Sequence, residues 1–95
     1  MNIKITGKHL EISPEIKNFI EESLKHIEKF EHNVMDCEVI IELNGRRYKV
    51  EIDVDVKKHR FVSSDESYDL MTSIDKAIDK MKTQLKKFEE KKHDR

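Results

Sequence analysis

Cysteine, glycine and long apolar runs are scarce in this sequence, and each scarcity excludes a class of protein. With Cys37 as the single cysteine, there is no internal disulfide and no cysteine-rich zinc site. Gly7 and Gly45 are too few for a glycine-rich phosphate-binding loop. No segment approaches the ~18 apolar residues of a membrane span, and the N-terminus lacks the apolar core of a signal peptide. We therefore expect one soluble, cytoplasmic domain over residues 1–95.

Groups suited to catalysis or metal binding are also few. Asp53 and Asp55 share one face of an expected strand, where solvation leaves them unsuited to acid–base catalysis. Cys37 falls on the apolar phase of its strand, so it is expected in the core rather than as a nucleophile. The histidines show no metal-ligand spacing: His9, His26, His32, His59 and His93. We expect no enzymatic activity, no metal and no cofactor.

Charge is abundant but almost balanced. Charged residues make up 41% of the chain, with 19 Lys and Arg, 20 Asp and Glu and a formal net charge of −1. The apolar residues nevertheless recur in regular periods, which indicates a thin core inside a solvated surface rather than disorder. Binding to a polyanion would therefore require local segregation of charge.

The last third of the chain, residues 68–92, is predicted to form one long amphipathic helix. Apolar residues recur there at three- and four-residue steps: Leu70, Met71, Ile74, Ala77, Ile78, Met81, Leu85 and Phe88. A second row shares one exposed flank, at about 100° per residue: Lys76, Lys80, Lys87 and Lys91. A function must explain this cationic helix.

The first third is predicted to supply a short strand and a second helix. Residues 2–6 alternate in polarity and end at Gly7, as a strand does. Ser13-Pro14-Glu15 then provides a capping hydroxyl, a proline suited to the first helical position and a carboxylate at the positive end of the helix dipole. An apolar stripe continues this helix to about residue 31.

The middle of the chain shows the alternation that is typical of a β-hairpin. Apolar and charged residues alternate over residues 37–43 and 48–57, on either side of Asn44-Gly45. This dipeptide tolerates positive φ at both centres of a tight turn. Residues 60–63 indicate a weaker fourth strand, and the candidate caps of the last helix are Ser64, Asp65 and Ser67.

The predicted element order is β-α-β-β-β-α, which places the chain in the α+β class. The first strand, helix and second strand form a βαβ unit with parallel strands, and the later strands follow as antiparallel neighbours. Only the two amphipathic helices can cover the apolar face of this four-stranded mixed sheet, so both are expected on one face.

This arrangement predicts an acidic and a basic side. The open sheet face would collect Glu38, Glu42, Glu51, Asp53 and Asp55 against Lys49 and Lys57. The helix layer would collect Lys25, Lys29, Lys76, Lys80, Lys87 and Lys91, a surface suited to phosphate. A lysine row is equally consistent with a solvated helix surface that binds nothing.

The aromatic residues predict no stacking on bases. Tyr48 falls on the inward phase of its strand, and Tyr68 and Phe88 fall on the apolar helical stripe. Any RNA partner should therefore be recognised by shape and phosphate rather than by sequence.

Three segments together resemble the ribosome hibernation-promoting factor family, which includes the ribosome-associated inhibitor. They are Met1 to Gly7, Leu10-Glu11-Ile12-Ser13-Pro14 and the run Tyr68-x-x-x-x-x-Ile74-Asp75-x-x-Ile78-Asp79-Lys80-Met81-x-x-Gln84-Leu85-x-Lys87. The resemblance covers essentially the whole chain. It implies the same β-α-β-β-β-α fold, similar in layout to double-stranded-RNA-binding domains.

The resemblance implies a non-catalytic factor that binds the small ribosomal subunit in the channel for messenger and transfer RNA. It would thereby silence idle ribosomes under stress, and a short form of this length would need a second hibernation factor to join two ribosomes. By position, the implied ribosomal-RNA contacts are Lys29, Lys80 and Lys87. Relatives have basic residues where this chain has Ser23, His26 and Thr83. The full expected RNA-binding set is Lys25, His26, Lys29, Lys76, Lys80, Lys82, Lys87 and Lys91.

Two alternatives use other surfaces or partners. A protein-interaction module would use the acidic sheet face or a free strand edge to hold a basic partner, for instance to modulate a transcription factor. A general double-stranded-RNA binder would recognise any A-form duplex without a ribosome.

Overall fold

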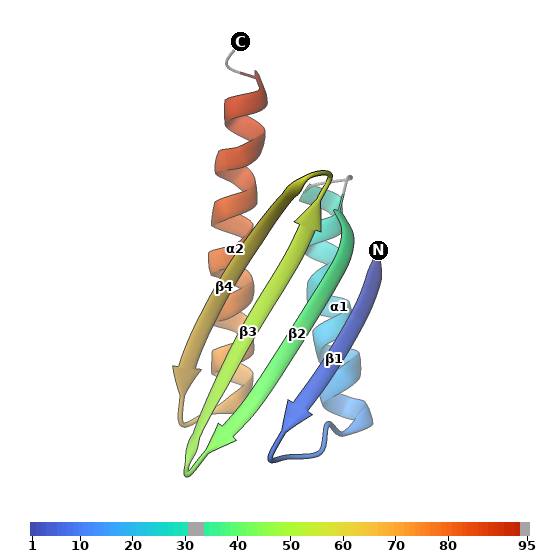
Figure 1. The fold of residues 1–95 in the computed structure, drawn as a ribbon. Helices are drawn as coiled ribbons and strands as arrows, with labels where there is room; N and C mark the ends of the chain where they lie inside the picture. The colour runs from blue at the N-terminus through green and yellow to red at the C-terminus, as the bar shows by residue number, and fades with distance from the viewer. Residues whose placement is uncertain (31–33, 94–95) are drawn as a thin grey trace.

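The computed structural model describes residues 1–30 and 34–93, with the elements in the predicted order. The strands are β1 (Asn2–Lys8), β2 (Val34–Asn44), β3 (Arg47–Val56) and β4 (His59–Ser67). The helices are α1 (Pro14–Phe30) and α2 (Leu70–His93). Figure 1 shows one sheet in front of two helices, and the C-terminal turns of α2 project beyond the sheet.

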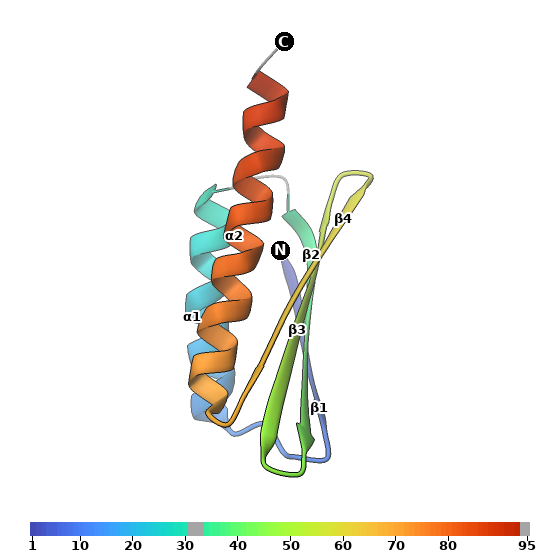
Figure 2. The same cartoon turned by 90° about the vertical axis from the view of Figure 1, so that its left-hand side faces the viewer.

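The sheet has the order β1-β2-β3-β4, so β1 and β4 are its edges. β1 pairs with β2 in parallel, and the other two pairs are antiparallel, which confirms the predicted mixed sheet. Figure 2 shows both helices on the same face, with the opposite face left open. α2 lies against β3 and β4, and α1 packs beside α2.

The start of α1 follows the sequence prediction. The Ser13 hydroxyl accepts a hydrogen bond from the backbone N–H of Ile16 at 3.2 Å, and the Ser13 carbonyl accepts the N–H of Lys17 at 3.0 Å. Pro14 occupies the first helical position, where its missing N–H costs nothing. The cap therefore fixes where α1 begins.

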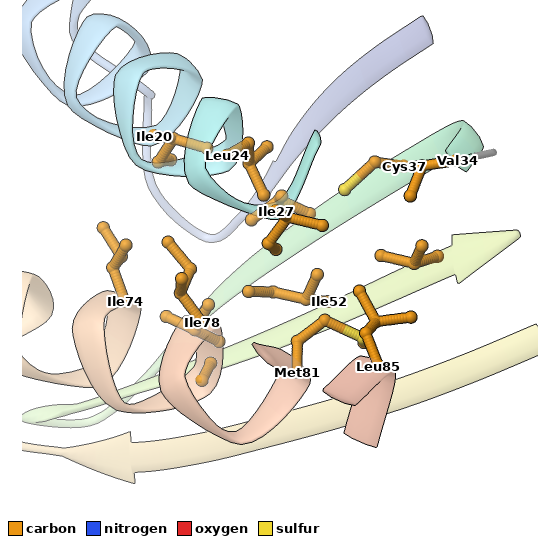
Figure 3. Close-up of a cluster of buried hydrophobic side chains, with 14 of the residues drawn as sticks. Ile20, Leu24, Ile27, Val34, Cys37, Ile52, Ile74, Ile78, Met81 and Leu85 are labelled. Atoms are coloured by element: carbon orange, nitrogen blue, oxygen red, sulfur yellow. The ribbon is translucent and has the colours of Figure 1, made fainter. Parts of the chain in front are cut away.

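The core lies between the helices and the inner face of the sheet (Figure 3). Ile20, Leu24 and Ile27 of α1 are fully buried against residues of α2 and of the central strands. Fully burying side chains of this size stabilises the fold by about 1.5–3 kcal/mol each. The largest of the other fully buried side chains are Ile41, Ile52, Ile74, Met81 and Leu85.

A buried polar seam joins α2 to the strands beneath it. The buried Ser63 hydroxyl donates to the Ala77 carbonyl at 2.7 Å. The buried Ser73 hydroxyl donates to the Tyr48 carbonyl at 3.1 Å and lies 2.6 Å from the Ser67 hydroxyl. Each buried hydroxyl is therefore satisfied, and α2 can approach β4 closely at Ala77.

The junction between β4 and α2 differs from the prediction. β4 runs to Ser67 because it pairs with β3 along its whole length, so Ser64 and Asp65 are strand residues rather than caps. The cap is Asp69, whose carboxylate accepts the N–H of Thr72 at 2.9 Å. Ser67 lies beside this cap, and its hydroxyl accepts the N–H of Asp69 at 3.3 Å.

The predicted apolar stripe of α2 packs on the core from Leu70 to Phe88 with the exception of Met71, and the prediction fails at Tyr68. Tyr68 precedes the helix and is 69% exposed, and Met71 is 38% exposed. The core prediction for Tyr68 was therefore wrong, because the helix begins two residues later than its periodicity suggests.

Both hairpin turns differ in detail from the prediction. Asn44 pairs with Arg47, so the centre of the first turn is Gly45-Arg46, and only Gly45 has positive φ there (62°). Lys57 lies in the turn between β3 and β4 with φ of 55°, rather than on the open sheet face.

No helix within residues 1–30 and 34–93 is both long and apolar enough to cross a membrane.

The Cys37 thiol should resist chemical modification in the folded protein. Burial, together with the negative charge of Asp53, raises the pKa of Cys37 to about 12, so little reactive thiolate forms at pH 8. We expect an aromatic disulfide reagent at pH 8 to modify the native chain far more slowly than the urea-unfolded chain. Equal rates in the two states would contradict the buried position of this thiol.

Asp69 should make the stability of the protein sensitive to acid. Hydrogen bonds from the Thr72 hydroxyl and N–H lower the pKa of Asp69, so the ionised form is favoured in the folded state. Its contribution is present above the unfolded pKa of about 3.9 and is lost as the pH falls through the lower folded value. Urea unfolding of Asp69→Ala should therefore show a deficit at pH 7 that shrinks in acid.

Asp69→Asn provides the matched control, because asparagine also caps helices but carries no charge. Its deficit at pH 7 should be smaller than that of the alanine variant. A deficit for Asp69→Ala that is constant from neutral pH to strong acid would contradict the role assigned to the carboxylate.

Candidate nucleic-acid interface

Two side chains of α2 fix the direction in which its lysine row faces. The Lys80 ammonium donates to the Ser64 carbonyl at 2.8 Å, and the Gln84 amide donates to the Val62 carbonyl at 2.7 Å. Both acceptors belong to β4, so this flank of α2 overhangs the β4 edge of the sheet.

Lys76 and Lys87 lie on the same flank. At about 100° per residue, both are within roughly 40° of Lys80 around the helix axis. Both side chains are exposed, and neither forms an ion pair with another residue of the described chain. Over Leu70–Glu90 this flank carries no Asp or Glu, so its positive charge is not balanced within α2. We call Lys76, Lys80 and Lys87 the lysine flank.

Lys82 lies elsewhere. It is half-buried and about 200° from Lys80, so it belongs to the side of α2 that faces α1. Asp75 and Asp79 share that side with it, together with Lys86, which makes the surface there mixed in charge. Lys82 is therefore not part of the lysine flank, although it belongs to the set of residues expected to bind RNA.

Of the cations predicted on α1, the structure describes the side chains of Lys25 and His26. The Lys25 ammonium is exposed and pairs with the Glu22 carboxylate at 3.0 Å, and His26 is exposed. Exposed pairs of this kind contribute little energy, so Lys25 can exchange Glu22 for another anion. The predicted contacts Lys29 and Lys91 have side chains outside the described part of the structure.

Asp65 was missed as a partner of the lysine flank. Its carboxylate lies 3.3 Å from the Lys80 ammonium, and its side chain is only 15% exposed. The other carboxylate oxygen, Oδ2, is buried and has no hydrogen-bond partner. The Lys80 ammonium is thus the main partner of the largely buried Asp65 carboxylate. Phe61, Ser63 and Asp65 alternate along one strand and therefore face the helices together. The sequence prediction ended the strand at Ser63, so Asp65 was not placed on that side.

Tyr68 and Arg47 form a second feature that the sequence did not predict. The Arg47 guanidinium carbon lies 4.9 Å from the centre of the Tyr68 ring, in a cation–π contact, and Arg47 Nε lies 3.7 Å from the Glu66 carboxylate. The signal for an exposed Tyr68 is the following Asp69-x-x-Thr72, a helix cap that leaves Tyr68 outside α2.

The open sheet face is acidic, as predicted, but it carries more cations than expected. Arg60 pairs with Asp53 and Lys4 pairs with Glu38, so β1 and β4 partly neutralise the central strands. Burial and the neighbouring Asp53 raise the pKa of Glu51. A hollow of about 540 Å³ on this face is lined by residues that include Asp36, Asp53 and Arg60.

Within residues 1–30 and 34–93, no group of three or more His, Cys, Asp or Glu side chains is placed to hold a metal ion.

Comparison with known proteins gives sequence relatives and structural neighbours over nearly the whole chain. A ribosome hibernation promoting factor of Pseudomonas putida is 29% identical over 91 residues, which cover 96% of this chain and 89% of the relative. A ribosomal subunit interface protein of Coxiella burnetii matches with a TM-score of 0.89 and 26% identity, covering 94% of this chain and 98% of that one. The N-terminal domain of Thermus thermophilus Protein Y matches with a TM-score of 0.85 and 32% identity, covering 93% and 99%.

The sequence model of one protein family matches residues 3–93, which includes every helix and strand described above except the first residue of β1. That family is described as "Sigma 54 modulation protein / S30EA ribosomal protein". The resemblance inferred from the α2 run, the Ser13-Pro14 cap and β1 is thereby confirmed: this chain belongs to the Sigma 54 modulation protein / S30EA ribosomal protein family.

Proposed function

We propose that this chain is a ribosome-associated hibernation factor that acts without catalysis. Its helix layer docks on ribosomal RNA of the small subunit, in the channel for messenger and transfer RNA, and so prevents translation. Membership of the family and the printed names of the relatives support the association with ribosomes. The charges of this chain's own residues support the docking surface.

The observation that carries the docking surface is the lysine flank. Lys76, Lys80 and Lys87 place three cations along roughly 16 Å of helix with no acid on the same flank. The open sheet face carries carboxylates on its two central strands, which a phosphate backbone would repel. RNA binding is therefore favoured on α2 and disfavoured on the sheet, although the net charge of the chain is −1.

Lys80 has a different role from its two neighbours. Lys76 and Lys87 have no anionic partner to give up among the described residues, so they are available to phosphate at once. Lys80 must leave Asp65 and the Ser64 carbonyl before it can contact RNA. Asp65 thus competes with phosphate for one of the three cations.

Replacing Lys76 and Lys87, the two lysines of the flank that have no ion-pair partner among the described residues, should weaken ribosome binding without unfolding the protein. We expect Lys76→Glu combined with Lys87→Glu to leave the thermal unfolding midpoint almost unchanged, because both side chains are exposed. Its affinity for small subunits should fall, and the slope of log affinity against log salt should drop by about 1 for each lost phosphate contact. Sucrose-gradient co-sedimentation at several salt concentrations measures both effects.

Lys8→Glu combined with Lys49→Glu is the matched control. It makes the same change in charge at exposed residues of the open sheet face. This control should bind like the wild type. If the control loses binding while the α2 variant keeps it, the docking surface is the sheet. Wild-type protein that stays at the top of the gradient at low salt would overturn the ribosome proposal itself.

Releasing Lys80 should strengthen RNA binding. In Asp65→Asn the ammonium loses its ionic partner, and an ion pair with this much exposure is worth about 0.2–1 kcal/mol. The affinity for small subunits at low salt should therefore rise by up to about fivefold. Asp55→Asn removes the same charge from the open sheet face and should change the affinity less. A loss of affinity in Asp65→Asn would show that Asp65 positions Lys80 for RNA instead of competing with it.

The acidic sheet face supports a second candidate function, the binding of a basic protein segment. Its carboxylates outnumber its cations even after Lys4, Lys8, Arg47, Lys49 and Arg60 are counted: Asp36, Glu38, Glu42, Glu51, Asp53, Asp55 and Glu66. In a complex with the helix layer on RNA, this face would point away from the RNA and remain free for a protein partner, such as a second hibernation factor.

A further inference from the structure

Tyr68 is held outside the core by the residues on either side of it. The Ser67 hydroxyl donates to the Asp69 carbonyl at 2.8 Å and lies 2.6 Å from the Ser73 hydroxyl. The Asp69 carboxylate caps α2. Because both neighbours are anchored, the ring of Tyr68 projects into solvent and remains 69% exposed. An exposed aromatic ring in an ordered junction requires an explanation, since a tyrosine ring usually contributes apolar area to a core or an interface.

The ring is also preorganised. Arg47 stacks over one of its faces at 4.9 Å, and the contact between Arg47 and Glu66 limits the movement of the guanidinium. One ring face is covered by a cation, and the high exposure of the residue leaves area for a second planar group. The adjacent Arg46 is exposed in the turn between β2 and β3, which adds a second guanidinium to the same corner.

We propose that Tyr68, with Arg47 behind it, is a stacking site for one unpaired base of an RNA strand. Base stacking on an aromatic side chain is tolerant of sequence, and a guanidinium on the opposite ring face adds a cation–π contribution. Arg46 supplies positive charge for a neighbouring phosphate. This inference rests on the proposed function. The lysine flank contacts phosphate groups, and Tyr68 would add a contact to an unpaired base.

The site lies at the corner where the open sheet face meets the start of α2. Tyr68 immediately precedes α2, and Arg47, which covers its ring, pairs with Glu66 of the open sheet face. Lys76 is the first lysine of the lysine flank beyond this corner. A strand that follows the lysine flank to the start of α2 therefore reaches the corner that Tyr68 occupies.

The chemistry of the corner favours RNA over a protein partner. Among the described residues, the exposed large apolar side chains near the start of α2 are Tyr68 and Met71. Arg47 covers one face of the ring, and stable protein interfaces need a larger apolar centre. A flat ring with cations beside it matches the composition of single-strand RNA sites.

The test separates stacking from charge. We expect Tyr68→Ala to bind small subunits about 5- to 100-fold more weakly while the salt slope stays at its wild-type value. Tyr68→Phe should keep most of the affinity, because the ring remains. Thermal unfolding of both variants should match the wild type, since the side chain is exposed.

A tryptophan reporter gives a second, independent readout. The chain has no tryptophan, so Tyr68→Trp introduces a single tryptophan at the site, which can be excited selectively. We expect a short oligoadenylate and the small subunit to quench its fluorescence. The same variant with Lys76→Glu and Lys87→Glu should require more RNA for the same quenching.

Three results would overturn the stacking site. The first is wild-type affinity in Tyr68→Ala while Lys76→Glu with Lys87→Glu binds weakly, which would leave the proposed function standing. The second is no quenching of Tyr68→Trp by RNA. The third is a loss of ribosome binding in Tyr68→Ala with unchanged binding to free RNA, which would assign the ring to a protein contact. Wild-type binding in both the lysine and the tyrosine variants would instead overturn the proposed function.

Discussion

The hydrogen bond between the Ser63 hydroxyl and the Ala77 carbonyl sets the rotation of α2 about its own axis. Both groups are buried, and breaking such a bond while the polar atoms stay buried costs about 1–3 kcal/mol. Apolar packing alone would permit small rotations, because a stripe of Ile, Leu and Met can repack. The serine contacts remove that freedom, and they thereby decide which lysines of α2 overhang β4 and which lie beside α1.

Local chemistry was sufficient to predict most of the fold. The alternation in β3, the Ser13-Pro14 start of α1 and the three- and four-residue steps from Ile74 to Leu85 each have one structural solution. The parallel pairing of β1 with β2 agrees with the connection through α1, because parallel neighbours need a crossover of this length. These features depend on residues that are close together in the sequence, so they could be predicted without the structure.

The features that were not predicted depend on neighbours in space. β4 includes Ser64 and Asp65, whose β propensity is low, because pairing with β3 overrides local preference. The exposure of Tyr68 depends on where that strand ends, and the contact of Lys80 with Asp65 depends on the rotation of α2. A helical wheel could place Lys76, Lys80 and Lys87 on one flank, but it could not tell that one of the three already has a carboxylate.

The side chains that α2 extends over β4 also affect how this protein behaves next to copies of itself. An edge strand with free carbonyl groups can accept a strand from another molecule and so begin an aggregate. The carbonyls of Val62 and Ser64 point outward but are already occupied by Gln84 and Lys80. The β4 edge is therefore a poorer template for sheet growth at these two residues, and the same helix flank that carries the cations blocks it there.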